Sequence, residues 1–156
     1  MLAILIFIVF FLITNIYTSI NHLTVEKKIK RFGLENLYGF YYPEQENTIM
    51  YNWTRNEAVK ILRKKGDVVC IPIGNSRPEI EENNVNLKIT INDKIKCSYK
   101  MNSNDWKLVL INVKEIKDDY IKIKFDVDKT WRPIDLLEDS IDKRILGVKV
   151  GEIYWE

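Results

Sequence analysis

The sequence contains little of what most catalytic sites are built from. It has one histidine in 156 residues, His22, and two cysteines, Cys70 and Cys97. The chain after His22 therefore cannot supply a Ser-His-Asp or Cys-His arrangement, and two cysteines are too few for a cysteine-built zinc site. The glycine-rich phosphate-binding motifs and the G-x-S-x-G motif are also absent. The sequence predicts a protein that is not an enzyme, with no catalytic residues, no metal and no cofactor.

An excess of charge of either sign is missing as well. The chain carries 24 Lys and Arg against 22 Asp and Glu, which gives a net charge of +2. No broad cationic face that could follow a phosphate backbone is expected, so nucleic acid is not a predicted partner. Six Gly and four Pro exclude collagen-like and low-complexity classes.

Charged side chains are absent from the first part of the chain. Residues 2–13 are continuously apolar, and the first charge is Glu26. A helix over residues 2–20 is long enough to cross a membrane, so we expect a transmembrane anchor at 1–25 and a basic juxtamembrane linker at 26–36. A cleaved signal peptide is the competing interpretation. The retained anchor is favoured because the segment has no N-terminal Lys or Arg and no small-x-small cleavage pattern.

From residue 37 onward, apolar and polar residues mostly alternate with a period of two, which is typical of strands with one buried face. We therefore predict that 37–156 is an all-β, antiparallel β-sandwich of the jelly-roll or immunoglobulin-like kind. Predicted strands are 37–42, 49–54, 67–73, 87–91, 95–100, 106–111, 121–125 and 146–155, the last with a bulge at Gly151. Predicted inward residues are Ile89, Ile91, Leu108, Ile121, Ile123, Phe125, Val148 and Val150.

Three local features qualify this pattern. Thr54 and Glu57 have the spacing of a capping box before apolar residues at helical spacing, so local rules favour a helix over 55–65. Asn92-Asp93-Lys94 predicts a tight hairpin turn, and residues 135–143 are expected to contain a short helical turn.

Aromatic residues are the main chemical signal. Sugar rings stack on aromatic faces, while their hydroxyls bind carboxylates and guanidinium groups. Trp53 and Trp106 occupy predicted strands and are expected to be structural core residues. Trp131 follows a strand and precedes an acidic loop, where its ring is either a lid on the core or a platform for a ligand.

Acidic pairs offer a weaker chemical signal. Glu44 with Glu46, and Asp139 with Asp142, have the residue types needed for acid–base work in glycoside hydrolysis. Carboxylates are common on any surface, so solvated loop residues are the favoured interpretation.

Three sequence stretches together resemble a known family. They are Gly39-Phe40-Tyr41-Tyr42-Pro43-Glu44, then Tyr51-Asn52-Trp53-Thr54 with Ala58-Val59-Lys60-Ile61, then Thr130-Trp131-Arg132-Pro133 with Asp142-Lys143-Arg144-Ile145-Leu146-Gly147-Val148. This pattern is similar to a bacterial and archaeal β-sandwich module found beside or fused to membrane glycosyltransferases and other envelope-glycan proteins. The resemblance implies a strand, not a helix, at 58–62, and no catalytic residues. Asn52 stands where the family commonly has Arg.

The closing motif also has a physical interpretation. Asp142 and Arg144 flank one residue, so we expect each side chain to reach elsewhere, Arg144 to Glu44 and Asp142 to backbone N–H groups. Gly147 would allow close backbone approach. A structural clasp is favoured here over a ligand site, although the aromatic plane and charged groups nearby make Trp131, Arg132, Glu44 and Arg144 the candidate ligand-binding residues.

We therefore expect a non-catalytic, membrane-anchored accessory or glycan-recognition module of cell-envelope glycan assembly. Its expected partners are a glycan or lipid-linked sugar and a membrane glycosyltransferase. The alternative is a purely structural protein–protein interaction module beside such a transferase.

The side of the membrane is indicated in two opposite ways. By the positive-inside rule, the basic cluster after the anchor places the domain in the cytoplasm: Lys27, Lys28, Lys30 and Arg31. The family resemblance implies the outer face, which we prefer. Buried free thiols are the default expectation for Cys70 and Cys97, and a disulfide between them could form only on that outer side, so the sequence leaves their pairing open.

Overall fold

The computed structural model describes residues 36–156, so the expected anchor and basic linker lie outside the described residues. Within 36–156 no helix is long and apolar enough to cross a membrane. The elements are β1 (Asn36–Glu46), β2 (Ile49–Arg63), β3 (Val68–Gly74), β4 (Val85–Ile91), β5 (Ile95–Met101), β6 (Lys107–Asn112), β7 (Tyr120–Val127), α2 (Pro133–Leu136), β8 (Lys149–Gly151) and β9 (Tyr154–Trp155).

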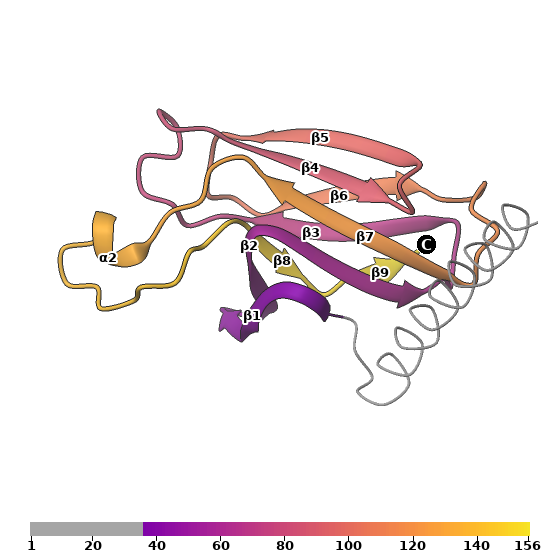
Figure 1. Cartoon of the computed structure of the whole chain (residues 1–156), viewed down its shortest axis with the longest axis horizontal. Coiled ribbons are helices and arrows are strands. Elements are labelled where there is room, and N and C mark those ends of the chain that lie inside the picture. The colour runs from indigo at the N-terminus through magenta and orange to yellow at the C-terminus, as the bar shows by residue number, and fades with distance from the viewer. Residues whose placement is uncertain (1–35) are drawn as a thin grey trace, which may run out of the picture. The chain divides into compact units, whose positions relative to one another are not determined.

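The strands form one antiparallel sheet that curls around an apolar core. Its order is β5-β4-β7-β2-β8-β3-β6, with β1 added on β2 and β9 on β3. In Figure 1, β7 crosses in front of β3, and inward side chains of both strands, such as Phe125 and Ile71, belong to one buried cluster. The prediction of an all-β antiparallel domain is confirmed. The Asn92-Asp93 turn is also confirmed, because Ile91 pairs with Ile95 and both turn residues have positive φ.

Strand β2 connects the two halves of the sheet. Its first half pairs with β8, from Tyr51 to Trp53, and its second half pairs with β7, from Glu57 to Arg63. The helix that local rules favour over 55–65 is therefore wrong, and the strand alternative is correct. Thr54 does not cap a helix; its buried hydroxyl accepts the backbone N–H of Val148 at 2.9 Å. Pairing on both edges outweighs the local helical spacing.

The predicted core is correct except on the edge strand β6. Leu108 is 50% exposed, whereas the other predicted inward residues are buried: Ile89, Ile91, Ile121, Ile123, Phe125, Val148 and Val150. In β6 the inward residues are Val109 and Ile111, so the predicted phase is displaced by one residue. A one-residue displacement moves a side chain to the opposite face of a sheet. Leu108 and Leu110 consequently face outward.

The C-terminal segment differs from the single strand predicted over 146–155. It forms β8, which lies between β2 and β3, and then β9, which pairs with the other end of β3. The strand β8 ends at Gly151, where the phase change was expected. The predicted helical turn begins earlier than expected, at Pro133, whose fixed φ suits a first helical position. Cys70 and Cys97 are both free thiols.

Candidate functional site

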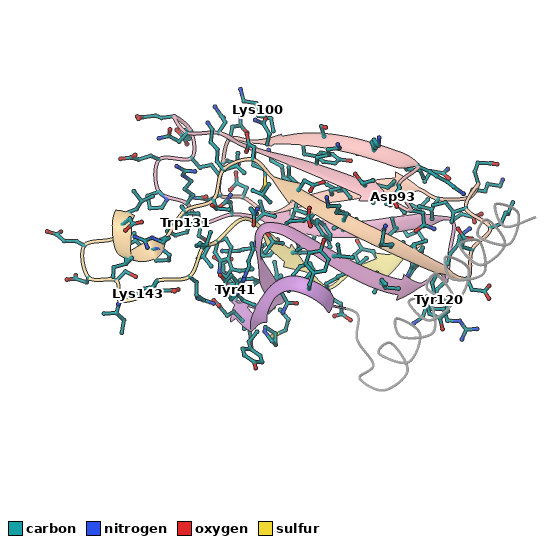
Figure 2. The ribbon with its side chains drawn as sticks, viewed as in Figure 1. Tyr41, Asp93, Lys100, Tyr120, Trp131 and Lys143 are labelled. Carbon is teal, nitrogen blue, oxygen red and sulfur yellow. The ribbon has the colours of Figure 1, made fainter. Side chains whose placement is uncertain are left out.

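A second group of apolar side chains lies on the face of β2 and β8 opposite the main core. Val148 and Val150 of the β8 segment point into the core, so Lys149 between them points outward. Around it gather the residues that we call the aromatic cluster: Tyr51, Trp53, Trp131 and Leu146, with Tyr41 and Trp106 packed against them. The expected core residues Trp53 and Trp106 thus belong to this separate cluster. Figure 2 shows Tyr41 over β1 and β2, and Trp131 near the start of α2.

Lys149 is buried at the centre of the aromatic cluster. Only 3% of its surface is exposed, and its Nζ lies 5.0 Å from the ring centroid of Tyr51. Nζ also lies 5.6 Å from the Trp53 centroid and 5.8 Å from the Trp106 centroid. Three aromatic faces and one carboxylate therefore surround a single ammonium group.

The carboxylate that balances Lys149 is Glu46. Lys149 Nζ donates to Glu46 Oε2 at 2.7 Å, and the Trp106 indole N–H donates to the same oxygen at 3.1 Å. The hydrogen bond from Lys149 is the main reason that the pKa of Glu46 is lowered. Sequence reasoning missed the role of Lys149, because a lysine between two core valines is the pattern of a solvent-facing strand position.

Arg144 forms an ion-pair network with two carboxylates. Its Nη1 contacts Glu44 Oε1 at 2.5 Å, and its Nη2 contacts Asp142 Oδ2 at 2.7 Å. The Glu44 contact predicted for Arg144 is confirmed. The expectation that Asp142 is too close to pair with Arg144 is wrong, since the turn brings both side chains together and Asp142 Oδ1 also accepts the Arg144 backbone N–H at 2.9 Å. We call these three residues the Arg144 network.

The carboxylates of the network accept hydrogen bonds from Arg144 and from Tyr51. Donation from Arg144 lowers the pKa of Asp142. The Tyr51 hydroxyl donates to Glu44 Oε2 at 3.3 Å, and burial, followed by the nearby charge of Glu44, raises the pKa of Tyr51 to about 12. The network joins β1 to a segment 100 residues away in the chain. The network therefore has the structural role predicted for it as a clasp, which is to hold β1 against the closing segment.

Tyr41 completes the clasp. Both Arg55 Cζ and Arg144 Cζ lie 5.3 Å from its ring centroid. Its hydroxyl donates to the Ile145 carbonyl at 3.2 Å and accepts the Ile145 N–H at 3.1 Å. Asn52, the departure from the family pattern, donates to the Tyr41 carbonyl at 2.9 Å and so holds the backbone of β1 in place.

The candidate ligand residues are only partly brought together. Glu44 and Arg144 are joined, but Arg132 pairs with Asp135 instead, at 2.6 Å. Trp131 is 6% exposed and packs edge-on against Trp53, with ring centroids 6.0 Å apart. Of the two alternatives for Trp131, the lid is correct. A Trp131→Ala variant would thus remove packing as well as any ligand contact.

Close backbone approach at Gly147 is confirmed. A Cβ there would lie 2.4 Å from the Arg55 carbonyl oxygen and 2.5 Å from Thr54 Oγ1. The Gly147 N–H donates to the Thr54 carbonyl at 2.7 Å. A larger residue would separate the closing segment from β2 and disturb the clasp.

An exposed ring was missed by sequence reasoning. Tyr42, adjacent to Tyr41 in β1, is 92% exposed. The sequence carried no clear signal for it, because Tyr41 and Tyr42 lie where the pairing of β1 with β2 shifts register, between Phe40 and Pro43, and a period of two does not hold there. Tyr42 therefore offers the exposed ring that the platform alternative for Trp131 would have supplied.

One member of each acidic pair lacks the raised pKa of a general acid. Glu46 and Asp142 both have lowered pKa values, whereas a general acid working near neutrality needs a raised one. Among the described residues no group of His, Cys, Asp and Glu side chains is arranged to hold a metal ion.

Comparison with known proteins gives few matches. No protein-family model matches the sequence, and no curated protein matches it. One similar solved structure is the carbohydrate-binding module TmCBM61 in complex with beta-1,4-galactotriose, with 13% identity over 71% of each chain and a TM-score of 0.37. Another is a carbohydrate-binding module, CBM4, with 9% identity over 80% of this chain and 81% of the other, and a TM-score of 0.36. Scores this low carry no argument about the ligand of this chain.

Proposed function

We propose that this protein is a non-catalytic glycan-recognition module of cell-envelope glycan assembly. The observation that carries the proposal is one surface, which we call the tyrosine–arginine surface: Tyr41, Tyr42, Glu44, Asp142 and Arg144. There, the exposed Tyr42 directly follows Tyr41 in the chain, and the Tyr41 ring contacts the fixed network of donors and acceptors around Arg144.

The chemistry of this surface suits a sugar. The side chains of Arg144, Glu44 and Asp142 are 35%, 35% and 28% exposed, so solvent and ligands reach them. Their mutual contacts hold the guanidinium and carboxylate groups in one orientation before any ligand arrives, which lowers the entropic cost of binding. The Tyr42 ring supplies an apolar face for sugar C–H groups, and the network supplies partners for hydroxyls.

Membrane attachment is part of the proposal. Its support is the uncharged segment at residues 2–20, which is long enough to span a hydrocarbon core. We place the domain on the outer face, where lipid-linked sugars would be transferred, with a membrane glycosyltransferase as the partner. The basic residues at 27–31 favour the opposite side, and neighbouring helices of a partner can override them.

Glycan binding by the full chain in detergent tests the proposal. A glycan array selects the tightest ligand, and calorimetry then compares the wild type with Tyr42→Ala and Glu44→Gln. Loss of one stacking contact should weaken binding about tenfold. Tyr120→Ala is the matched control, because Tyr120 is 46% exposed at the opposite end of the sheet from Trp131 (Figure 2). No bound glycan, or equal affinity in Tyr42→Ala and Tyr120→Ala, would contradict the proposal.

A protein–protein interaction module is the second candidate, favoured by a different surface. Leu108, Leu110 and Tyr154 are 50%, 54% and 43% exposed. Cross-strand pairing places Tyr154 and Leu110 on either side of Cys70, so they form an apolar stripe over β9, β3 and β6. A structural partner bound there would be lost from detergent-solubilised complexes on Leu110→Asp substitution, with glycan binding absent in the wild type.

A further inference from the structure

Strand β6 is a free edge of the sheet and has an apolar sequence. The strands β6 and β5 stand at the two ends of the strand order (Figure 1). Within residues 36–156, β6 pairs only with β3, and β5 pairs only with β4. An unpaired edge offers backbone N–H and C=O groups to any other extended chain, so native proteins protect such edges, often with charged side chains.

The two edges of this sheet differ in that protection. The outward residues of β5 are Lys96, Ser98 and Lys100, and all are exposed. In β6 the only charged residue is Lys107 at the first position, and apolar residues follow it as far as Ile111. The edge at β6 is therefore the one that the sequence leaves open to pairing.

The pairing of β6 with β3 fixes which backbone groups of β6 are free. Pro72 of β3 lies opposite Leu108 and has no N–H, so these two residues cannot exchange two hydrogen bonds. Hydrogen-bonded pairs alternate along an antiparallel ladder, and the bond from the Val113 N–H to the Asp67 carbonyl, 2.7 Å long, fits this alternation. The N–H and C=O groups of Leu108 and Leu110 therefore point away from β3, toward the open edge.

The same two residues also carry exposed apolar side chains. Leu108 and Leu110 are 50% and 54% exposed on the outer face of the sheet. A strand added at this edge would gain ladder hydrogen bonds from their backbones and cross-strand contacts from their side chains. The edge and the apolar stripe thus form one continuous surface.

A second copy of the chain fits this edge by symmetry. A two-fold interface uses the same patch on both subunits, and two β6 strands that pair antiparallel around Val109 satisfy this condition. In that register, Leu108 of each copy lies opposite Leu110 of the other copy. The residues with free N–H and C=O groups then meet one another and can exchange hydrogen bonds.

The charges beside β6 favour this register. Pairing centred on Val109 brings Asp105 of each copy next to Lys114 of the other, so opposite charges meet at both ends of the interface. Asp105 and Lys114 are exposed, and neither forms an ion pair within the part of the chain that the structure describes. Pairing centred on Leu110 would instead align Asp105 with Glu115, and like charges in opposite positions are destabilising.

We propose that the protein forms a two-fold dimer in which the β6 strands of two copies pair antiparallel around Val109. The dimer joins the two sheets into one and assigns a second copy to the β6 part of the apolar stripe. It uses no residue of the tyrosine–arginine surface. It therefore goes beyond the glycan proposal and does not depend on it.

The mass of the full chain in detergent tests the dimer. Sedimentation, with the bound detergent subtracted, should give twice the chain mass for the wild type. Leu110→Lys places a charge on the open edge and should weaken dimerisation by at least about tenfold. Ile141→Lys is the matched control and should stay dimeric, because Ile141 is 91% exposed in the loop before β8. A Leu110→Lys variant as dimeric as Ile141→Lys would overturn the proposal. A monomeric wild type would overturn it too and leave β6 to a strand of another protein.

Disulfide trapping tests the register and does not depend on Leu110→Lys. The background is Cys97→Ser, in which the remaining Cys70 is fully buried. There, Val109→Cys should give a disulfide-linked dimer on mild oxidation, because residue 109 is the position that lies opposite itself. Lys100→Cys, on the β5 edge, should stay unlinked. No linked dimer in Val109→Cys, or equal linking in the two variants, would contradict pairing around Val109.

Discussion

Lys149 shows how a single residue can set the character of one face of the sheet. Its ammonium group lies among the rings of Tyr51, Trp53 and Trp106 and pairs with Glu46. Burial of a charge is costly, and here it is compensated by one carboxylate and three ring faces. Lys149 thereby ties β8 to β1 and to the start of β6.

Removal of this charge should weaken the fold. Lys149→Met keeps the length of the side chain but leaves Glu46 without its cation, so we expect a loss of about 2 kcal/mol in the free energy of unfolding. Urea denaturation measures it. Lys88→Met is the control, because Lys88 is exposed on β4, and its cost should stay within about 0.5 kcal/mol. Equal effects of the two variants would contradict the role given to Lys149.

Acid should weaken the same contact. The pKa of Glu46 is lowered in the folded state, mainly by hydrogen bonding from Lys149. A lowered folded pKa means that the stabilisation is present above the unfolded value of 4.5 and is lost as the pH falls through the folded value. The difference in urea midpoint between wild type and Glu46→Gln should therefore shrink between about pH 5 and pH 3. A constant difference over that range would disprove the linkage.

At the scale of single residues, the sequence predicted a contact between two charged motifs correctly. It did not predict which side chains are buried. The Glu44–Arg144 contact followed from charges of opposite sign in two conspicuous motifs. The burial of Trp131 did not, because a tryptophan beside a loop suits either a lid or a platform until its neighbours are known. Lys149 was missed for the same reason, since its partners come from β1, from β2 and from Trp106, just before β6.

At the scale of elements, the phase of each strand decides which side chains matter for stability. Leu87 of β4 is fully buried, whereas Leu108 of β6 is 50% exposed on the outer face. Leu87→Ala should lower the free energy of unfolding by about 2–5 kcal/mol. Leu108→Ala should lower it by about 1 kcal/mol or less. Chemical denaturation of the two matched variants checks this, and a reversed order would refute the phase of β6.

Central strands could be predicted from the sequence, and edge or connecting strands less well. Residues 87–91 and 121–125 alternate cleanly because one face is core and the other is solvent. The inward phase of β6 was predicted wrongly because its outward residues, Leu108 and Leu110, are also apolar. Local rules favoured a helix in β2 because its apolar residues have helical spacing. Pairing with β7, β8 and β1 makes it a strand. Such pairing is long-range information that a local pattern does not contain.

At the scale of the whole molecule, the basic cluster at 27–31 and the family resemblance favour opposite sides of the membrane. Fusion of a reporter to the C-terminus distinguishes the two sides. A C-terminal alkaline phosphatase fusion should be active, because this reporter folds on the outer, oxidising side. A C-terminal green fluorescent protein fusion exported by the same route should be dark. The reverse result would place the domain in the cytoplasm, as the basic residues at 27–31 indicate. It would also remove envelope glycans as accessible ligands.

Glycan recognition at the tyrosine–arginine surface is tested most directly by mapping where a glycan binds. Backbone amide chemical shifts of the full chain in micelles would be recorded while the ligand selected on the array is added. We predict that the shifts change at Tyr41, Tyr42, Glu44 and Arg144, and stay constant at Leu108, Leu110 and Tyr154. A shift map confined to the apolar stripe, or no shift with any glycan, would contradict the account and leave the protein-interaction module in its place.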